Sequence, residues 1–158
     1  MMKKTLLSIM TMAALVSSAT ATAAVETKNI TVNAEIPHEI TMKKSNGEDI
    51  KKIELVPDNN SPTTYGAKES IVIASHGQDV KINLIEDFKL VSTTESGNSF
   101  TDLTVTMDGT ELATTPQKIG NKVSNIAKEL TIVGKAPSTS KGGEKYTGVL
   151  KLNLEPVT

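Results

Sequence analysis

The chain has 158 residues, a formal net charge of −1 and no Cys. Without Cys, a disulfide framework, thiol chemistry and zinc–cysteine sites are all excluded. All 17 basic residues are Lys. Since Arg is the side chain that grips phosphate through paired hydrogen bonds, its absence, together with the slight net acidity, argues against a nucleic-acid binder.

The first 24 residues have the layout of a secretion signal. Lys3 and Lys4 supply a short positive region, an apolar stretch runs from Leu6 to Val16, and small residues follow up to Ala24. The apolar stretch is shorter than the roughly 20 residues that span a bilayer. We therefore expect a cleaved signal peptide over residues 1–24 and an exported protein.

Cleavage after Ala24 would leave 134 residues with a formal charge of −3. This length suits one domain with one core, and no repeat or second domain is visible. Only two Phe and two Tyr are present, so the core is expected to be aliphatic.

The first segment with a regular pattern covers residues 29–36. Ile30, Val32, Ala34 and Ile36 alternate with polar residues, which is typical of a strand with one apolar face, and Pro37 ends the run. Burying that face would be worth about 5–10 kcal/mol. No tight-turn pair folds the run back on its successor. The apolar face of this run is therefore buried either in the sandwich of its own chain or in another subunit, which the run joins by strand addition.

Short strands are expected along the rest of the chain. They cover residues 39–42, 53–55, 69–74, 80–84, 88–91, 103–107, 110–113, 129–133 and 146–154. The strongest hairpin signal is Asp108-Gly109, and a second turn is expected at His76-Gly77. Loops are expected over 57–62, 94–99 and 134–144, and the only helical signal is one turn within 123–129.

This pattern of seven to nine short strands, with turns every 8–12 residues, predicts an all-β domain, either a sandwich or a small barrel.

Residues able to carry out chemistry are scarce. His38 and His76 are the only histidines and have no metal-ligand spacing. Glu86-Asp87 is an acidic pair at an expected strand end, which favours a solvated position. No nucleophile elbow or phosphate-binding glycine loop occurs. We expect no catalytic residue, no metal, no cofactor and no enzymatic activity.

Two stretches resemble a known family. Residues 25–34, Val-Glu-Thr-Lys-Asn-Ile-Thr-Val-Asn-Ala, are similar to the mature N-terminus of major pilin subunits of the colonisation-factor-antigen type. These subunits of alternate chaperone–usher fimbriae begin Val-Glu-Lys-Asn-Ile-Thr-Val-Thr-Ala. Residues 143–152 resemble the family's closing Gly-x-Tyr-x-Gly-Val-Val strand, with Lys145 as one extra residue. The lack of Cys also fits, and the match places signal cleavage between Ala24 and Val25.

The resemblance implies an immunoglobulin-like sandwich that lacks its final strand. By position, Ile30, Val32, Ala34 and Ile36 would be the donor-strand residues that fill the groove of a neighbouring subunit. The acceptor groove, which also pairs with the chaperone, would be lined by Tyr146, Gly148, Leu150, Leu152 and Leu154. The implied partners are neighbouring pilin subunits, a periplasmic chaperone, an outer-membrane usher and, through the fimbrium, the host-cell surface.

The expected organisation is a signal peptide over 1–24, a donor-strand extension over 25–37 and a pilin domain over 38–158. The leading hypothesis is a structural subunit of a surface fimbrium, exported through the periplasm and used for attachment to host cells. Two alternatives stay open: a minor adhesive subunit of the same system, and a secreted monomeric β-sandwich that binds a ligand. An exported hydrolase ranks last, for want of a nucleophile and a base.

Overall fold

The structure, a computed structural model, describes residues 27–35, 39–94, 97–120 and 126–157. The chain divides into two compact units, Met1–Glu35 and Ile36–Thr158. The expected signal peptide, the cleavage position between Ala24 and Val25, the last donor residue Ile36 and Pro37 lie outside the described residues.

In the first unit, residues 27–35 form no strand and are exposed. Ile30 and Val32 are 82% and 85% exposed. The apolar face predicted for this segment is therefore not covered by any described residue of its own chain.

The described part of the second unit is built from strands alone, as the sequence predicts. The strands are β1 (Thr41–Lys44), β2 (Val56–Asp58), β3 (Ser61–Ala74), β4 (Val80–Leu84), β5 (Val91–Ser92), β6 (Thr101–Met107), β7 (Thr110–Glu111), β8 (Gln117–Ile119), β9 (Ala127–Lys135), β10 (Tyr146–Thr147) and β11 (Leu152–Pro156). Every pairing between them is antiparallel.

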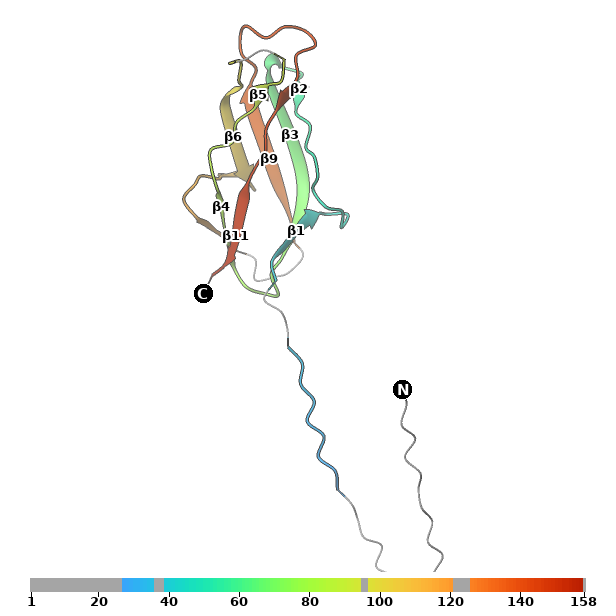
Figure 1. Ribbon diagram of the computed structural model, residues 1–158. Coiled ribbons are helices and arrows are strands. Elements are labelled where there is room, and N and C mark those ends of the chain that lie inside the picture. Colours follow the sequence, from blue (N-terminus) through green and yellow to red (C-terminus); the bar gives the residue numbers. More distant parts are fainter. Residues whose placement is uncertain (1–26, 36–38, 95–96, 121–125, 158) are drawn as a thin grey trace, which may run out of the picture. The chain divides into compact units, whose positions relative to one another are not determined.

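The strands form one large sheet and two small ones (Figure 1). The large sheet has the order β1-β3-β9-β6-β7, with β2 also paired to β3. A second sheet has the order β11-β4-β8, and β10 pairs with β5. Both small sheets contain a strand from the C-terminal run of the chain, β10 in one and β11 in the other. Together they form one layer opposite the large sheet.

The core between the layers is aliphatic, as expected. Its ten buried residues are Ile71, Ile73, Val80, Ile82, Leu84, Val105, Met107, Leu112, Leu130 and Ile132. Within each strand they alternate with more exposed residues, because successive strand side chains point to opposite faces. Complete burial of each side chain of this size is worth about 1.5–3 kcal/mol, so this cluster is the main source of stability.

Three of the four aromatic residues pack together at one end of the core. The ring centroids of Tyr65 and Phe100 are 5.5 Å apart, and those of Phe100 and Tyr146 are 5.0 Å apart, both edge-to-face. This geometry is the favourable one for aromatic pairs. The cluster links β3 of the large sheet to β10 of the other layer.

Both expected turns are present. Asp108 and Gly109 have φ values of 48° and 79° between β6 and β7. His76 and Gly77 have φ values of 50° and 82° between β3 and β4. Consecutive positive φ angles are typical of the tight turns that match strand twist.

Several boundaries differ from the sequence prediction. Residues 53–55 are not a strand, and β2 begins at Val56; β3 starts at Ser61 inside the expected loop. Residues 127–129 belong to β9 rather than to a helical turn, and Gly134 extends β9 into the expected loop. At these boundaries, the presence or absence of a neighbouring strand determines the conformation more than local propensity does. The strand β8 was not predicted.

The C-terminal run pairs first with β5 and then with β4. Tyr146 is opposite Ser92 in β10, whereas Leu152 is opposite Leu84 in β11. Between the pairs Thr147–Val91 and Leu152–Leu84, the six residues 85–90 face the four residues 148–151, so the segment before Val91 bulges. Gly148 lies at this bulge, and a Cβ there would approach the carbonyl oxygen of Lys89 to 2.0 Å.

Gly148→Ala is expected to lower the free energy of unfolding by about 1–3 kcal/mol. The added methyl group would collide with the backbone of Lys89, which cannot move without disturbing the bulge. Denaturant titration measures the effect. Gly142→Ala is the matched control, because a Cβ at Gly142 meets nothing within 4 Å. Equal stability of the two variants would contradict the predicted collision.

Candidate functional site

The C-terminal run, residues 146–156, lies at an edge of its layer. Both β10 and β11 are terminal strands in their sheets, so each has a partner on one side only among the described residues. An edge strand presents backbone N–H and C=O groups that can pair with another chain. This edge is the candidate functional site.

The hydrogen bonds to β4 show which residues present these groups. The N–H of Ile85 donates to the carbonyl of Lys151 at 3.0 Å, and the N–H of Val157 donates to the carbonyl of Asp79 at 2.9 Å. Odd-numbered residues therefore face β4. Because backbone groups alternate along an antiparallel strand, the even-numbered Leu150, Leu152 and Leu154 present theirs on the other side. We call this backbone edge of residues 150–154 the open edge.

The side chains at the open edge point into the core but are incompletely covered. Leu152 and Leu154 are opposite Leu84 and Ile82, and the latter two are only 7% and 0% exposed. By contrast, Leu150, Leu152 and Leu154 are half-buried and pack against the core cluster. On their outer side, these leucine side chains are not fully covered by other described residues.

A second group of apolar side chains is also half-buried against the core. It comes from β1 and the segment before β2, and comprises Ile40, Met42, Ile50, Ile53 and Leu55. Like the leucines of the open edge, these residues lie at an edge of the fold, because β1 is a terminal strand of the large sheet.

The structure separates the residues expected to act together. Tyr146 packs against Phe100 and donates a hydrogen bond to Glu144, so its ring belongs to the aromatic cluster. Gly148 sits at the bulge beside Lys89. Ile30, Val32 and Ala34 are exposed in the other unit. The leucines are therefore the only residues of the expected acceptor set that combine half-buried side chains with outward-facing backbone groups.

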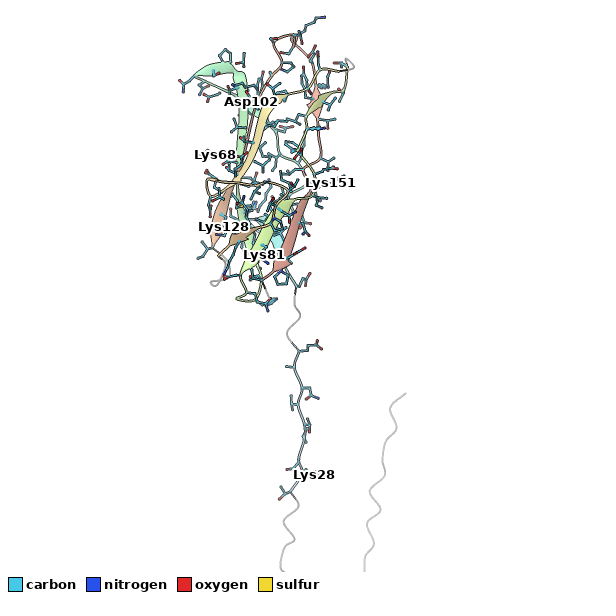
Figure 2. All side chains as sticks on the ribbon, turned by 90° about the vertical axis from the view of Figure 1, so that its left-hand side faces the viewer. Lys28, Lys68, Lys81, Asp102, Lys128 and Lys151 are labelled. Atoms are coloured by element: carbon cyan, nitrogen blue, oxygen red, sulfur yellow. The ribbon has the colours of Figure 1, made fainter. Side chains whose placement is uncertain are left out.

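The solvent face beside the open edge is polar and charged. The Nζ of Lys151 lies 2.8 Å from a carboxylate oxygen of Glu86, and the side-chain amide of Asn153 donates to that of Asn83 at 3.3 Å. The Lys151 label in Figure 2 marks this face. Val149 and Ile85, 71% and 59% exposed, are apolar exceptions here that the sequence alternation did not single out.

Charge pairing at this face affects the carboxyl of Glu86. The hydrogen bond from Lys151, and then its positive charge, hold the pKa of Glu86 below its ordinary value of 4.5. A lowered pKa in the folded state contributes stability above the ordinary pKa, and that contribution is lost as the pH falls through the lowered value. The side chains are exposed, so solvent weakens the pair.

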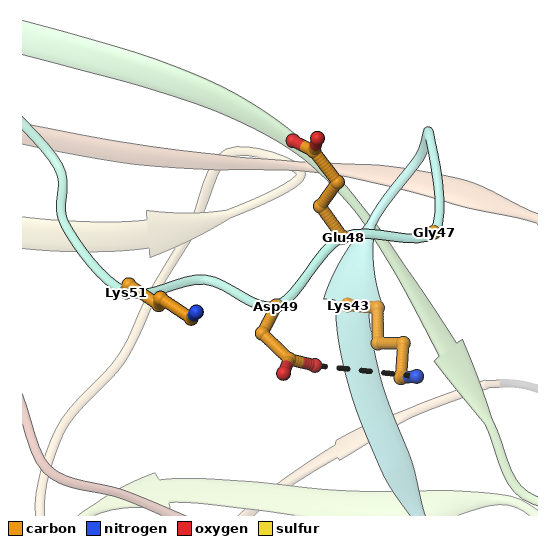
Figure 3. A pocket seen from close by; sticks show the side chains of 5 residues that line it. All are labelled: Lys43, Gly47, Glu48, Asp49 and Lys51. Atoms are coloured by element: carbon orange, nitrogen blue, oxygen red, sulfur yellow. Dashed lines mark ion pairs between the residues drawn. The ribbon is translucent and has the colours of Figure 1, made fainter.

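Two surface hollows among the described residues have charged linings. One is lined by Lys43, Gly47, Glu48, Asp49 and Lys51 (Figure 3), with the Nζ of Lys43 4.0 Å from Asp49. The other is lined by Glu86, Asp87, Lys89, Val149 and Lys151. Neither contains His or a nucleophilic side chain. No cluster of potential metal ligands occurs among the described residues, and this part of the chain contains no helix long and apolar enough to cross a membrane.

Comparison with known proteins shows which protein family and which solved structure this chain resembles. The family of CS1 type fimbrial major subunits matches residues 26–155. Among solved structures, the CooA pilin subunit from enterotoxigenic Escherichia coli is similar in fold, with a TM-score of 0.54 and 16% identity. The match covers 75% of this chain and 88% of that one. No curated protein sequence matches significantly.

Lys151→Met is expected to raise the pKa of Glu86 toward its ordinary value, because it removes the hydrogen bond and the charge that lower it. Titration of the side-chain carboxyl carbons by NMR measures the shift. The control is Lys68→Met, which should raise the pKa of Glu129 for the same reason and leave Glu86 unchanged. An unaltered pKa of Glu86 in the Lys151→Met variant would show that the ion pair is not formed.

Proposed function

The chain belongs to the family of CS1 type fimbrial major subunits, and we propose that its subunits are joined by a donor strand from one subunit inserted at the open edge of the next. As a member of this family it is a structural pilus subunit that polymerises with other pilin subunits into a fimbrium at the cell surface. The donor-strand mechanism is our proposal for how that polymer forms.

One observation carries the proposal: the half-buried leucines of β11 lie beside fully covered neighbours in β4. Ile82 is 0% exposed, whereas Leu154 opposite to it is half-buried. An added strand would supply the missing apolar contact and pair the outward-facing backbone groups of the open edge. Both gains come from one partner, which is the physical basis of strand addition.

The extension, residues 25–37, has the pattern that such a donor needs. Ile30, Val32 and Ala34 are exposed in the structure, and with Ile36 they alternate with polar residues. Their burial at the open edge would contribute about 5–10 kcal/mol. The domain organisation that follows is a donor extension over 25–37 and an acceptor domain over 38–158.

The ends of the strands favour insertion into a second subunit. Thr41 at the start of β1 is opposite Ala74, and Pro156 at the end of β11 is opposite Val80. Ala74 and Val80 are joined by the short turn that contains His76 and Gly77. β1 therefore begins at the same end of the domain where β11 finishes (Figure 1).

This arrangement sets the direction of the donor. A donor antiparallel to β11 ends near β10, so the donating domain lies at the end opposite the acceptor's own extension. Each subunit can then receive one strand and give one, which produces a head-to-tail filament. A donor parallel to β11 would instead place the donating domain at the end of the acceptor where its own β1 begins. The donating domain would then block the acceptor's own extension.

Further parts of the proposal concern export and use. An exposed apolar edge is an aggregation hazard before assembly, so a periplasmic chaperone would cover it and an outer-membrane usher would exchange the chaperone strand for the donor. Residues 1–24 would direct export and be removed after Ala24. The completed fimbrium would attach the bacterium to host cells.

Val32→Asp is expected to abolish fimbriae, because it places a carboxylate on the apolar face that must be buried. Thr31→Asp is the matched control: it adds the same charge one residue earlier, on the solvent face, and should assemble. Electron microscopy and the amount of polymer sheared from cells expressing each variant provide the readout. Normal fimbriae from the Val32→Asp chain would refute the donor-strand mechanism.

A further inference from the structure

We propose that Lys28 of the donating subunit and Pro156 of the accepting subunit fix the register in which the donor strand pairs with the open edge. This inference rests on the proposed donor-strand function. It names the residues that keep the donor from sliding along β11 in either direction. The donor residues involved, 28–34, are all among the described residues.

Only slides by two residues keep the apolar face of the donor inward. Leu150, Leu152 and Leu154 present their backbone groups outward and pack their side chains against the core. In an antiparallel pair, residues directly opposite share a face, so even-numbered donor residues lie opposite even-numbered residues of the open edge. A slip by one residue would turn the apolar side chains of the donor to solvent.

One register sets every described apolar donor residue opposite a leucine of the open edge. It places Ile30, Val32 and Ala34 opposite Leu154, Leu152 and Leu150, in that order. The bulkier two, Ile30 and Val32, then cover the leucines of β11, whose partners in β4 are almost completely buried. Each of the three pairs also exchanges two backbone hydrogen bonds.

Lys28 opposes a slide in one direction. That slide would move Lys28 from its place opposite Pro156 to a place opposite Leu154, with its side chain toward the core. Leu154 is paired with Ile82, which is 0% exposed, and an ammonium group brought against this apolar surface would lose hydration. The stem of Lys28 would have to bend outward to keep its charge in water, and Leu154 would lose the cover that Ile30 provides.

Pro156 opposes the slide in the other direction. That slide would move Ile30 from Leu154 to Pro156, which has no backbone N–H to donate, so the pair would lose one of its two hydrogen bonds. Pro156 is also exposed. Ile30, which is 82% exposed in the structure, would therefore gain little cover there.

The two residues select the same register independently. In that register Lys28 and Pro156 lie opposite each other. The apolar series of the donor therefore starts at Ile30, opposite the last outward N–H group of β11, which belongs to Leu154. One residue limits the donor through its charge, and the other limits the acceptor through its missing N–H.

Paired Cys substitutions report the register directly, because the chain itself has no Cys. In the proposed register Thr31 lies opposite Asn153, and Asn33 lies opposite Lys151, all on the solvent face. Such pairs lie between the hydrogen-bonded ones, with Cα atoms about 4.5 Å apart, which suits a disulfide. Residues displaced by two positions along the partner strand are about 7–8 Å apart, which is too far.

Fimbriae purified from cells expressing the full chain are oxidised and run on non-reducing gels. Thr31→Cys with Asn153→Cys, and Asn33→Cys with Lys151→Cys, should each give a ladder of linked subunits, since every chain carries one Cys as donor and one as acceptor. The mismatched controls combine Thr31→Cys with Lys151→Cys or with Glu155→Cys. They should give at least about fivefold less linked polymer.

Lys28→Ile tests the first of the two residues that fix the register. It replaces the charge by an apolar side chain, so the slide that places this residue opposite Leu154 is no longer opposed. Linkage between Thr31→Cys and Lys151→Cys should then rise at least about fivefold. Lys28→Arg is the matched control, because it keeps the charge and should leave the linkage pattern unchanged.

Pro156→Val tests the second residue. It restores a backbone N–H and offers an apolar side chain, so the opposite slide is no longer penalised. Linkage between Thr31→Cys and Glu155→Cys should rise, while the Lys28→Ile variant should leave this pair unlinked. Unchanged linkage patterns in both variants would refute the role of Lys28 and Pro156.

The outcomes separate the register from the mechanism on which it rests. If Val32→Asp chains still assemble, the donor-strand function fails and the register fails with it. If Val32→Asp blocks assembly while Thr31→Cys links to Lys151→Cys or Glu155→Cys as readily as to Asn153→Cys, only the register is refuted. The register is also refuted if neither matched pair forms a ladder in assembled fimbriae.

Discussion

The incomplete cover of β11 is the constraint on which this structure depends. Its backbone bonds to β4 on one side, and on the other side Leu150, Leu152 and Leu154 present backbone groups that have no strand partner among the described residues, above half-buried side chains. Backbone groups left unpaired in an apolar setting are costly, and exposed apolar edges invite association. The core of ten buried apolar residues lies between the layers, whereas the leucines at this edge are only half-buried. In the mechanism that we propose, a strand from the next subunit would pair with this edge and would join the two subunits.

In the proposed assembly, the connection from β3 to β4 would set the polarity of the polymer. Because Ala74 pairs with Thr41 and Val80 pairs with Pro156, one short turn brings the start of β1 and the end of β11 to the same end of the domain. The aromatic cluster of Tyr65, Phe100 and Tyr146 lies around the start of the acceptor run and stiffens the end that would meet the donating domain. The bulge at Gly148 lies between these two regions, and the missing side chain of this glycine lets the backbone of Lys89 approach closely.

Much of this could be predicted from the sequence, because period-two alternation depends only on which face is buried. The alternation correctly assigned β4, the β6–β7 hairpin, the apolar face of β9 and the inward leucines of the last run. The alternation failed where strand pairing, rather than the local sequence pattern, determines the conformation. Residues 61–67 of β3 are polar and turn-like, yet they pair with β9 from Thr64 onward. Alternation also could not show that the run 146–154 is interrupted at a bulge, nor that Tyr146 belongs to an aromatic cluster, since both depend on segments distant in sequence. The donor residues stay a prediction from alternation and family resemblance, because no strand partner for them lies among the described residues of the chain itself.

Amide hydrogen exchange at the open edge tests the central claim most directly. The measurement compares Leu152 and Leu154 in assembled fimbriae with the same amides in the full-length Val32→Asp subunit, with Asn153, which faces β4, as the internal reference. The account predicts that the Leu152 and Leu154 amides exchange at least about a hundredfold more slowly in the fimbria, as expected when a strand pairs with them, while Asn153 is protected in both states. Equal exchange of the two leucine amides in the polymer and in the unassembled subunit would contradict it.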